Sequence, residues 1–307
     1  MPVEGLEIRG VRKGDVPRAA ELLLMAFEDE LSGRGSDVAR LKRLLSFFTS
    51  FGRLPLRLLH SLGVVAELWV ACAEGKVVGV LGQIGRRVPY MSGIAIDPAF
   101  RGRGIAQALF HRVFSDLARK GFPLVRGAVL SHNQAALNLC AKTGLVPYAR
   151  TRLYVLPLPP ARLPKASPGI KVRCARARDL RPLWPKGLDG EGLRRLLSLE
   201  GGYEAWPFRL LGVWNVGLVA EREGELIGYL GVQANRFQTA GTIRAPLLFA
   251  EEAYPPLLGA ALKELVRLGR KVAYIDLFEE QKGLSPLLQG LGARPDRAWV
   301  HLARRLP

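Results

Sequence analysis

The residues with the most chemical content form a glycine- and arginine-rich turn at 101–106. Gly102 and Gly104 allow the main chain to approach a ligand closely, because glycine has no Cβ and adopts conformations that other residues avoid. Arg101 and Arg103 place cationic side chains beside the turn. An apolar, strand-like segment precedes the turn and a helical pattern follows it, so backbone N–H groups are exposed at a helix N-terminus. This combination predicts a site for a phosphate or a pyrophosphate.

Two common phosphate-binding motifs are excluded. A Walker loop needs Gly-Lys-Ser/Thr after the glycines, and none follows Gly104. A dinucleotide fingerprint needs three glycines between the first strand and helix and an acidic residue downstream, and the turn lacks this pattern. Taken by itself, the turn is also compatible with an ordinary strand–turn–helix connection.

A second motif follows at 133–145, with the sequence NQAALNLCAKTGL. Asn133 is suited to cap a helix, and Ala136 and Leu139 lie on one face of that helix at i and i+3. Gly144 is a typical residue just beyond a helix C-terminus. Asn133 is therefore either a simple helix cap or part of a binding element.

Together, the two motifs resemble the Arg/Gln-x-x-Gly-x-Gly/Ala and Asn-x-x-Ala-x-x-Leu-Tyr-x-x-x-Gly-Phe patterns of the GNAT superfamily of acyltransferases. The resemblance implies that the turn holds the pyrophosphate of coenzyme A, and that the strand before it binds the pantetheine and polarises the thioester carbonyl. The implied cofactor-binding residues are Ile94, Ala95, Ile96, Arg101, Gly102, Arg103, Gly104, Ile105, Ala106, Gln107 and Asn133.

The resemblance also implies an N-acyltransferase that moves an acetyl or related acyl group from acyl-CoA to the amine of a small molecule or peptide. The amine attacks directly in a ternary complex, with no covalent enzyme intermediate and no metal. The alternative is a non-catalytic protein that binds acyl-CoA and acts in regulation or interaction.

The chain departs from the family pattern at two catalytic positions. Cys140 stands where the general-acid tyrosine is usual, and Ala128 stands where some members carry a glutamate. A thiol with an ordinary pKa of about 8.5 is matched to a departing thiolate, whereas the alternative role of Cys140 is that of a small buried residue. The general base is unassigned. Weaker candidates near the expected site are Glu28, Asp29, Glu30, Tyr90 and His132.

The elements that position these residues form a mixed α/β pattern. After a strand, helices and a hairpin, the pattern predicts strand 90–96, helix 105–119, strand 124–130, helix 133–142 and strand 147–156. We expect a mixed, mostly antiparallel twisted sheet flanked by helices, which agrees with the GNAT fold.

The sequence is also repeated. Four blocks of the first half recur in order and at similar spacing in the second half, which indicates a tandem duplication. We expect an acyl-CoA-binding domain at 1–157, a Pro-rich linker at 158–168 and a degenerate GNAT-like domain at 169–307. The paired blocks are 8–15 with 172–179, 69–79 with 218–228, 94–109 with 247–262, and 144–147 with 292–295.

The second copy lacks the features of a phosphate site. At 254–259 it reads YPPLLG, in which two prolines remove amide donors and Leu257 replaces the glycine at position 104. Gln281 stands where Asn133 stands in the first copy. We expect this copy to keep the fold and to lose the cofactor loop. Its Asp276, Glu279 and Glu280 are either contacts for the acceptor or members of a solvated edge.

Composition adds little to the assignment of function. The 307-residue chain has 45 basic and 27 acidic residues, a net charge of +18, but no long basic run, so a nucleic-acid partner is not indicated. No apolar run reaches the roughly 18 residues of a membrane span, and the N-terminus lacks the pattern of a signal peptide. Three cysteines without metal-ligand spacing indicate a reduced, cytoplasmic protein. A basic amphipathic region at 38–62 fits acceptor-side helices better than a membrane surface.

Overall fold

The chain forms two compact units. The computed structural model describes residues 5–32, 64–86, 88–165, 167–199, 213–235 and 238–307. Unit 1 comprises Met1–Val129, Asn133–Pro147 and His301–Pro307, and unit 2 comprises Leu130–His132 and Tyr148–Val300. Each unit thus contains residues from separate parts of the chain, and the boundaries at 157 and 169 stay a prediction.

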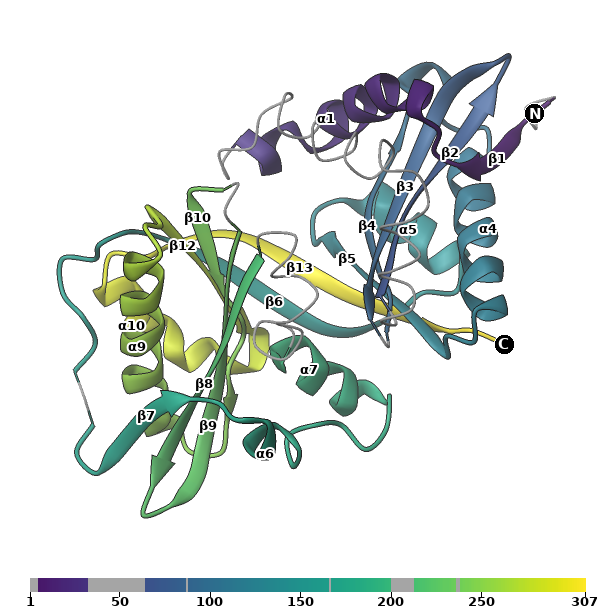
Figure 1. Ribbon diagram of the computed structural model, residues 1–307. Coiled ribbons are helices and arrows are strands. Elements are labelled where there is room, and N and C mark those ends of the chain that lie inside the picture. The colour runs from purple at the N-terminus through teal and green to yellow at the C-terminus, as the bar shows by residue number, and fades with distance from the viewer. Residues whose placement is uncertain (1–4, 33–63, 87, 166, 200–212, 236–237) are drawn as a thin grey trace. The chain divides into compact units, whose positions relative to one another are not determined.

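Unit 1 contains a sheet in the order β1-β2-β3-β4-β5, in which β4 and β5 are parallel and the other pairs are antiparallel. Helix α1 packs on one face, where Leu22 and Leu23 join Val70 and Val80 in the core. Helix α4 covers the other face (Figure 1). Its Leu109 packs closely on β3, so that a Cβ built on Gly79 would lie 3.2 Å from Leu109 Cδ1. The elements are β1 (Glu7–Gly10), α1 (Val16–Ser32), β2 (Val64–Ala73), β3 (Lys76–Arg86), β4 (Tyr90–Ile96), α4 (Ile105–Arg119), β5 (Leu124–Leu130) and α5 (Gln134–Lys142).

Unit 2 contains strands in the order β6-β12-β10-β9-β8-β7, and β11 pairs with β9. Helices α9 and α10 share one core with the sheet, and residues of the α6 and α7 region form a second core on the opposite face (Figure 1). The elements with most of their residues in this unit are β6 (Val146–Pro157), β7 (Ile170–Cys174), α6 (Ala177–Leu180), α7 (Gly190–Leu199), β8 (Val213–Arg222), β9 (Glu225–Asn235), β10 (Ala240–Ile243), β11 (Leu247–Leu248), α9 (Tyr254–Arg267), β12 (Val272–Phe278), α10 (Ser285–Gly290) and β13 (Arg294–Arg305).

The duplication is visible in the detailed geometry of each unit. In unit 1, Arg9 donates to both carboxylate oxygens of Asp15 at 2.5 and 3.1 Å, and that carboxylate also accepts from the Arg12 amide at 2.7 Å. In unit 2, Arg173 donates to Asp179 at 2.6 and 2.9 Å. The Asp179 carboxylate likewise accepts from the backbone amide three residues earlier, at 2.6 Å. The same strand-to-helix connection therefore occurs twice.

The β2–β3 and β8–β9 hairpins also match. Glu74 and Glu223 have φ of 51° and 52°, and a glycine with positive φ follows each of them. Each hairpin has a register shift a few residues from its turn. The prediction of a mixed α/β fold is confirmed. The predicted amphipathic region at 38–62 lies outside the described residues.

Candidate functional site

Strands β4 and β5 of unit 1 separate after a single contact. In the part of the chain that the structure describes, they share one register pair, Tyr90 with Arg126. There the Arg126 amide donates to Pro89 O at 2.9 Å. Beyond this point β4 stays paired with β3 as far as Ile96, but it has no register pair with β5. The opening leaves one edge of β4 available to a ligand.

The register decides which groups of β4 face the opening. The Asp97 amide donates to Val78 O on β3 at 2.8 Å, and hydrogen-bonding direction alternates along an antiparallel strand. Ala95 therefore directs its N–H and C=O toward β3, whereas Ile94 and Ile96 direct theirs into the opening. Of the three β4 residues predicted from the sequence, two present backbone groups to this site.

A bulge bends β4 at the inner end of the opening. The register passes from Leu81–Ile94 to Gln83–Met91, so two residues of β4 stand opposite one residue of β3. One of the two is Gly93, with φ of +83°. The positive φ favours glycine at this position, and a Cβ there would also be tight, at 3.2 Å from the Phe27 ring. Such a bulge increases the local bend of the strand and supports the divergence from β5.

The glycine-rich turn lies between β4 and the N-terminus of α4. Gly102 and Gly104 have φ of +74° and +78°, and a Cβ on either would meet nothing within 4 Å. The first intrahelical bond runs from the Ala108 amide to Gly104 O at 3.0 Å, so the amides of 105–107 precede the helical hydrogen-bond ladder. This open space beside helix-terminal amides fits a phosphate or pyrophosphate.

Side chains hold the turn in place. Asp97 Oδ1 accepts from the Ala99 amide at 2.9 Å, and its other oxygen is paired with Arg18 of α1. Arg101 Nε donates to Ile96 O at 3.3 Å, and the Arg103 guanidinium lies 5.1 Å from the centre of the Phe100 ring. Both arginines are exposed, so their charges are accessible to an anion at the turn.

The second motif forms α5 of the same unit. Asn133 Oδ1 accepts from the Ala136 amide at 3.0 Å, so this exposed side chain caps the helix. Cys140 is 5% exposed, and burial raises the pKa of its thiol to about 11. This environment favours the packing role of Cys140. His132 is exposed, and the side chains of residues 28–30 lie outside the described residues.

The last residues of the chain complete unit 1, which the motifs did not predict. Arg304 donates to Thr143 O at the end of α5, and its guanidinium lies 4.6 Å from the centre of the Phe114 ring on α4. The Leu306 amide donates to Pro123 O at 3.0 Å, just before β5. Arg304 thus connects the two helices that carry the predicted motifs.

Unit 2 lacks the corresponding cradle. In the repeated blocks 94–109 and 247–262, Arg101 corresponds to Tyr254. Helix α9 begins at Tyr254, whereas α4 begins at Ile105, four residues after Arg101. The turn has become the first turn of the helix, with Pro255 and Pro256 in it and Leu257 completely buried. The segment that aligns with the glycine-rich turn of unit 1 is therefore helical in unit 2.

The gap between strands is also closed in unit 2. Strands β10 and β12 share four register pairs, and Gln281 Nε2 then donates to Pro246 O at 2.9 Å. The predicted linker packs against the same unit: Arg162 donates to Gly290 O at 2.7 Å, and Ser167 Oγ donates to Glu252 O at 3.2 Å.

Comparison with known proteins gives the family. Residues 43–145 match the model of the acetyltransferase (GNAT) family. Along its whole length, the chain resembles a tandem GNAT protein from the clavulanic acid biosynthesis pathway. That match has 16% identity and a TM-score of 0.60, and it covers 98% of this chain and 99% of the other. Residues 43–145 thus carry the match to the GNAT family, and the whole chain shares the fold of a tandem GNAT protein. A search of curated proteins found no match.

Two further structures share the fold of this chain along its length. A GCN5-related N-acetyltransferase from Sphaerobacter thermophilus has 16% identity and a TM-score of 0.64, covering 100% of this chain and 97% of the other. A putative acetyltransferase from Pyrococcus horikoshii has 14% identity and a TM-score of 0.56, covering 99% and 91%. Among the described residues, no helix is long and apolar enough to span a membrane, and no cluster suited to a metal ion is found.

Proposed function

We propose that unit 1 binds acetyl-CoA, or another acyl-CoA, and transfers the acyl group to the amine of a small-molecule or peptide acceptor. The divergence of β4 from β5, which leads directly to the open turn at Gly102 and Gly104, carries this proposal. The GNAT family uses acyl-CoA as the donor. The opening between β4 and β5 suits the pantetheine arm of this donor, and the glycine-rich turn suits its pyrophosphate.

Each part of the site has a distinct role in the proposal. The amides of 105–107 and the side chains of Arg101 and Arg103 hold the pyrophosphate. The backbone groups of Ile94 and the N–H of Ile96 bind the pantetheine, and a β4 amide polarises the thioester carbonyl by donating to its oxygen. Bound acyl-CoA supplies an activated acyl group, which the acceptor amine attacks directly in its neutral form.

The proton transfers are assigned to water in the opening. The Cys140 thiol is buried and has a pKa of about 11, so it is poorly placed to protonate a departing thiolate. Cys140 therefore has a packing role in this proposal. A non-catalytic acyl-CoA-binding protein is the second candidate function, because unit 1 has cysteine and alanine at the two usual catalytic positions, 140 and 128.

Binding and turnover separate the two candidates. We expect calorimetric titration with coenzyme A to give one site per chain, because the opening between β4 and β5 and the glycine-rich turn both belong to unit 1. We expect acetyl-CoA to be consumed in the presence of at least one member of a panel of amines, measured as release of free thiol. Binding with no turnover on any amine would establish the second candidate instead. No binding of coenzyme A would overturn both.

A further inference from the structure

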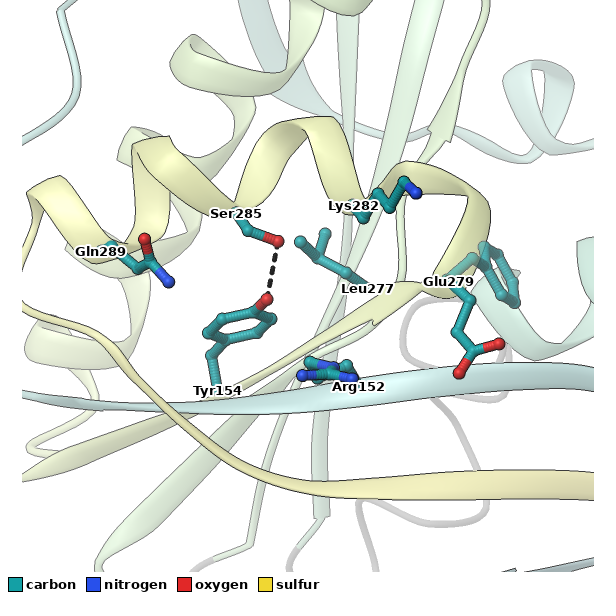
Figure 2. Close-up of a pocket in the computed structure, with 8 residues that line it drawn as sticks. Arg152, Tyr154, Leu277, Glu279, Lys282, Ser285 and Gln289 are labelled. Carbon is teal, nitrogen blue, oxygen red and sulfur yellow. Dashed lines mark hydrogen bonds between the residues drawn. The ribbon is translucent and has the colours of Figure 1, made fainter. Parts of the chain in front are cut away.

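Unit 2 has a pocket of its own, with a volume of about 510 Å³. It lies where α10 and the turn before it cover β6 and β12 (Figure 2). The family motifs do not include any of the residues that line this pocket. The opening between β4 and β5 and the glycine-rich turn both belong to unit 1. The residues that line it are Arg152, Tyr154, Leu277, Phe278, Glu279, Lys282, Ser285 and Gln289.

The floor of the pocket carries a pair of hydrogen-bonded hydroxyl groups. Tyr154 is 3% exposed, and its hydroxyl donates to Ser285 Oγ at 2.6 Å. Figure 2 shows the tyrosine ring extending from β6 toward the serine on α10. Because Ser285 Oγ accepts from Tyr154, its own proton is available to a ligand. Leu277, which stands opposite Arg152 in the sheet register, adds a buried apolar surface.

The rim of the pocket has an excess of positive charge. Arg152 and Lys282 are exposed, and neither forms an ion pair with any residue that the structure describes. One acidic residue, Glu279, lines the pocket with them. The neighbouring Glu280 is already paired with Arg194 at 3.1 Å, so it does not offset the two cations. The lining therefore has a net charge of +1, supplied by groups on β6 and on the turn before α10.

We propose that this pocket binds a small organic oxyanion, a metabolite that carries a carboxylate or a phosphate group. The planar guanidinium of Arg152 suits two-point contact with either group, and Lys282 adds a second positive charge. Ser285 Oγ and the Gln289 amide are donors for the remaining oxygens, and Leu277 and Phe278 contact the carbon skeleton. Glu279 disfavours highly charged ligands such as polyphosphates, so mono- and dianions bind best.

This site differs chemically from the turn in unit 1. The turn presents backbone amides at a helix N-terminus, whereas the pocket in unit 2 relies on two cationic side chains and a hydroxyl. The two sites can therefore be disabled one at a time. Arg150, an exposed arginine two residues before Arg152 on the same strand, does not line the pocket and provides a control with the same change in charge.

Succinate and inorganic phosphate are suitable probes, titrated into the full-length chain at constant ionic strength and followed by calorimetry. We expect saturable binding of at least one probe, with a dissociation constant at least about tenfold weaker in Arg152→Gln and in Lys282→Gln. Arg150→Gln is expected to bind within about twofold of the wild type. Gly104→Glu, which disables the turn in unit 1, is expected to leave this binding unchanged. Because Arg152 and Lys282 are exposed, their variants should keep the circular dichroism spectrum of the wild type.

The outcomes are distinct. Binding of succinate alone indicates a carboxylate ligand, binding of phosphate alone indicates a phosphorylated one, and either supports the pocket. Three results would overturn it: neither probe saturates, Arg150→Gln loses as much affinity as Arg152→Gln, or Gly104→Glu abolishes the binding. The last result would place the anion at the turn in unit 1. Failure of coenzyme A to bind would contradict the proposed function only.

Discussion

Replacing Gly104 with glutamate tests the cofactor turn directly. Gly104 lies at the N-terminus of α4 with φ of +78°, and a Cβ there would meet nothing within 4 Å. The new side chain therefore has room in the free protein. In the complex it would occupy the space assigned to the pyrophosphate and would place a carboxylate beside it. The structure thus separates an effect on binding from a steric effect on folding.

The magnitude follows from two contributions. A non-glycine residue in the left-handed region costs about 1–2 kcal/mol of stability, which should lower the melting temperature by a few degrees. A carboxylate about 5 Å from a phosphate charge, at an effective dielectric constant of about 40, costs about 1.7 kcal/mol per charge pair. Two such pairs cost about 3 kcal/mol, so we expect the dissociation constant for coenzyme A to rise by at least about 100-fold.

Calorimetric titration with coenzyme A measures the effect, and Gly121→Glu is the matched control. Gly121 follows the other end of α4, has φ of +77° and also has nothing within 4 Å of a built Cβ. We expect Gly121→Glu to lower the melting temperature by a similar amount and to bind coenzyme A within about twofold of the wild type. If Gly104→Glu binds coenzyme A as well as Gly121→Glu does, the turn is not the pyrophosphate site.

Three other changes have defined outcomes. Arg304→Met should lower the free energy of unfolding in urea by about 2 kcal/mol, because it removes a charged donor and a cation–π contact. A decrease below about 0.5 kcal/mol would contradict the view that Arg304 stabilises unit 1 by connecting α4 and α5. Cys140→Ala should leave kcat within about threefold of the wild type, whereas a loss of more than tenfold would restore the thiol as an acid. Hydrogen bonds from Arg173 lower the pKa of the Asp179 carboxyl from 3.8 to about 2. The stabilising effect of this carboxylate is therefore present above about pH 4 and is lost as the pH falls toward 2. Asp179→Asn should therefore cost about 1–2 kcal/mol of stability at neutral pH, and unfolding measured between pH 4 and 2 should show less acid destabilisation in this variant than in the wild type.

Local patterns in the sequence predicted the elements of unit 1 well. The strand 90–96, the helix 105–119 and the strand 124–130 have the predicted bounds. Local signals stand beside them in the sequence, namely Asp97-Pro98, Gly104, Gly121 and Pro123. Asn133 caps α5 just before the helix begins. The repeated blocks were equally informative, since the Arg9–Asp15 and Arg173–Asp179 pairs lie within short stretches of chain whose geometry is set locally.

The sequence by itself determined the glycine-rich turn, the α5 motif, the internal repeat and the replacement of Gly104 by Leu257 in the second copy, because all of these can be recognised from residue types and their spacing. Tertiary structure alone decided the rest. The opening between β4 and β5 depends on pairing between separate strands, which left Ile94 and Ile96, but not Ala95, to face it. Arg304 reached α4 and α5 from the far end of the chain, and the pocket at Tyr154 arose where β6 met α10. Contacts between distant segments are absent from local patterns, because they depend on how the complete sheet and its helices pack.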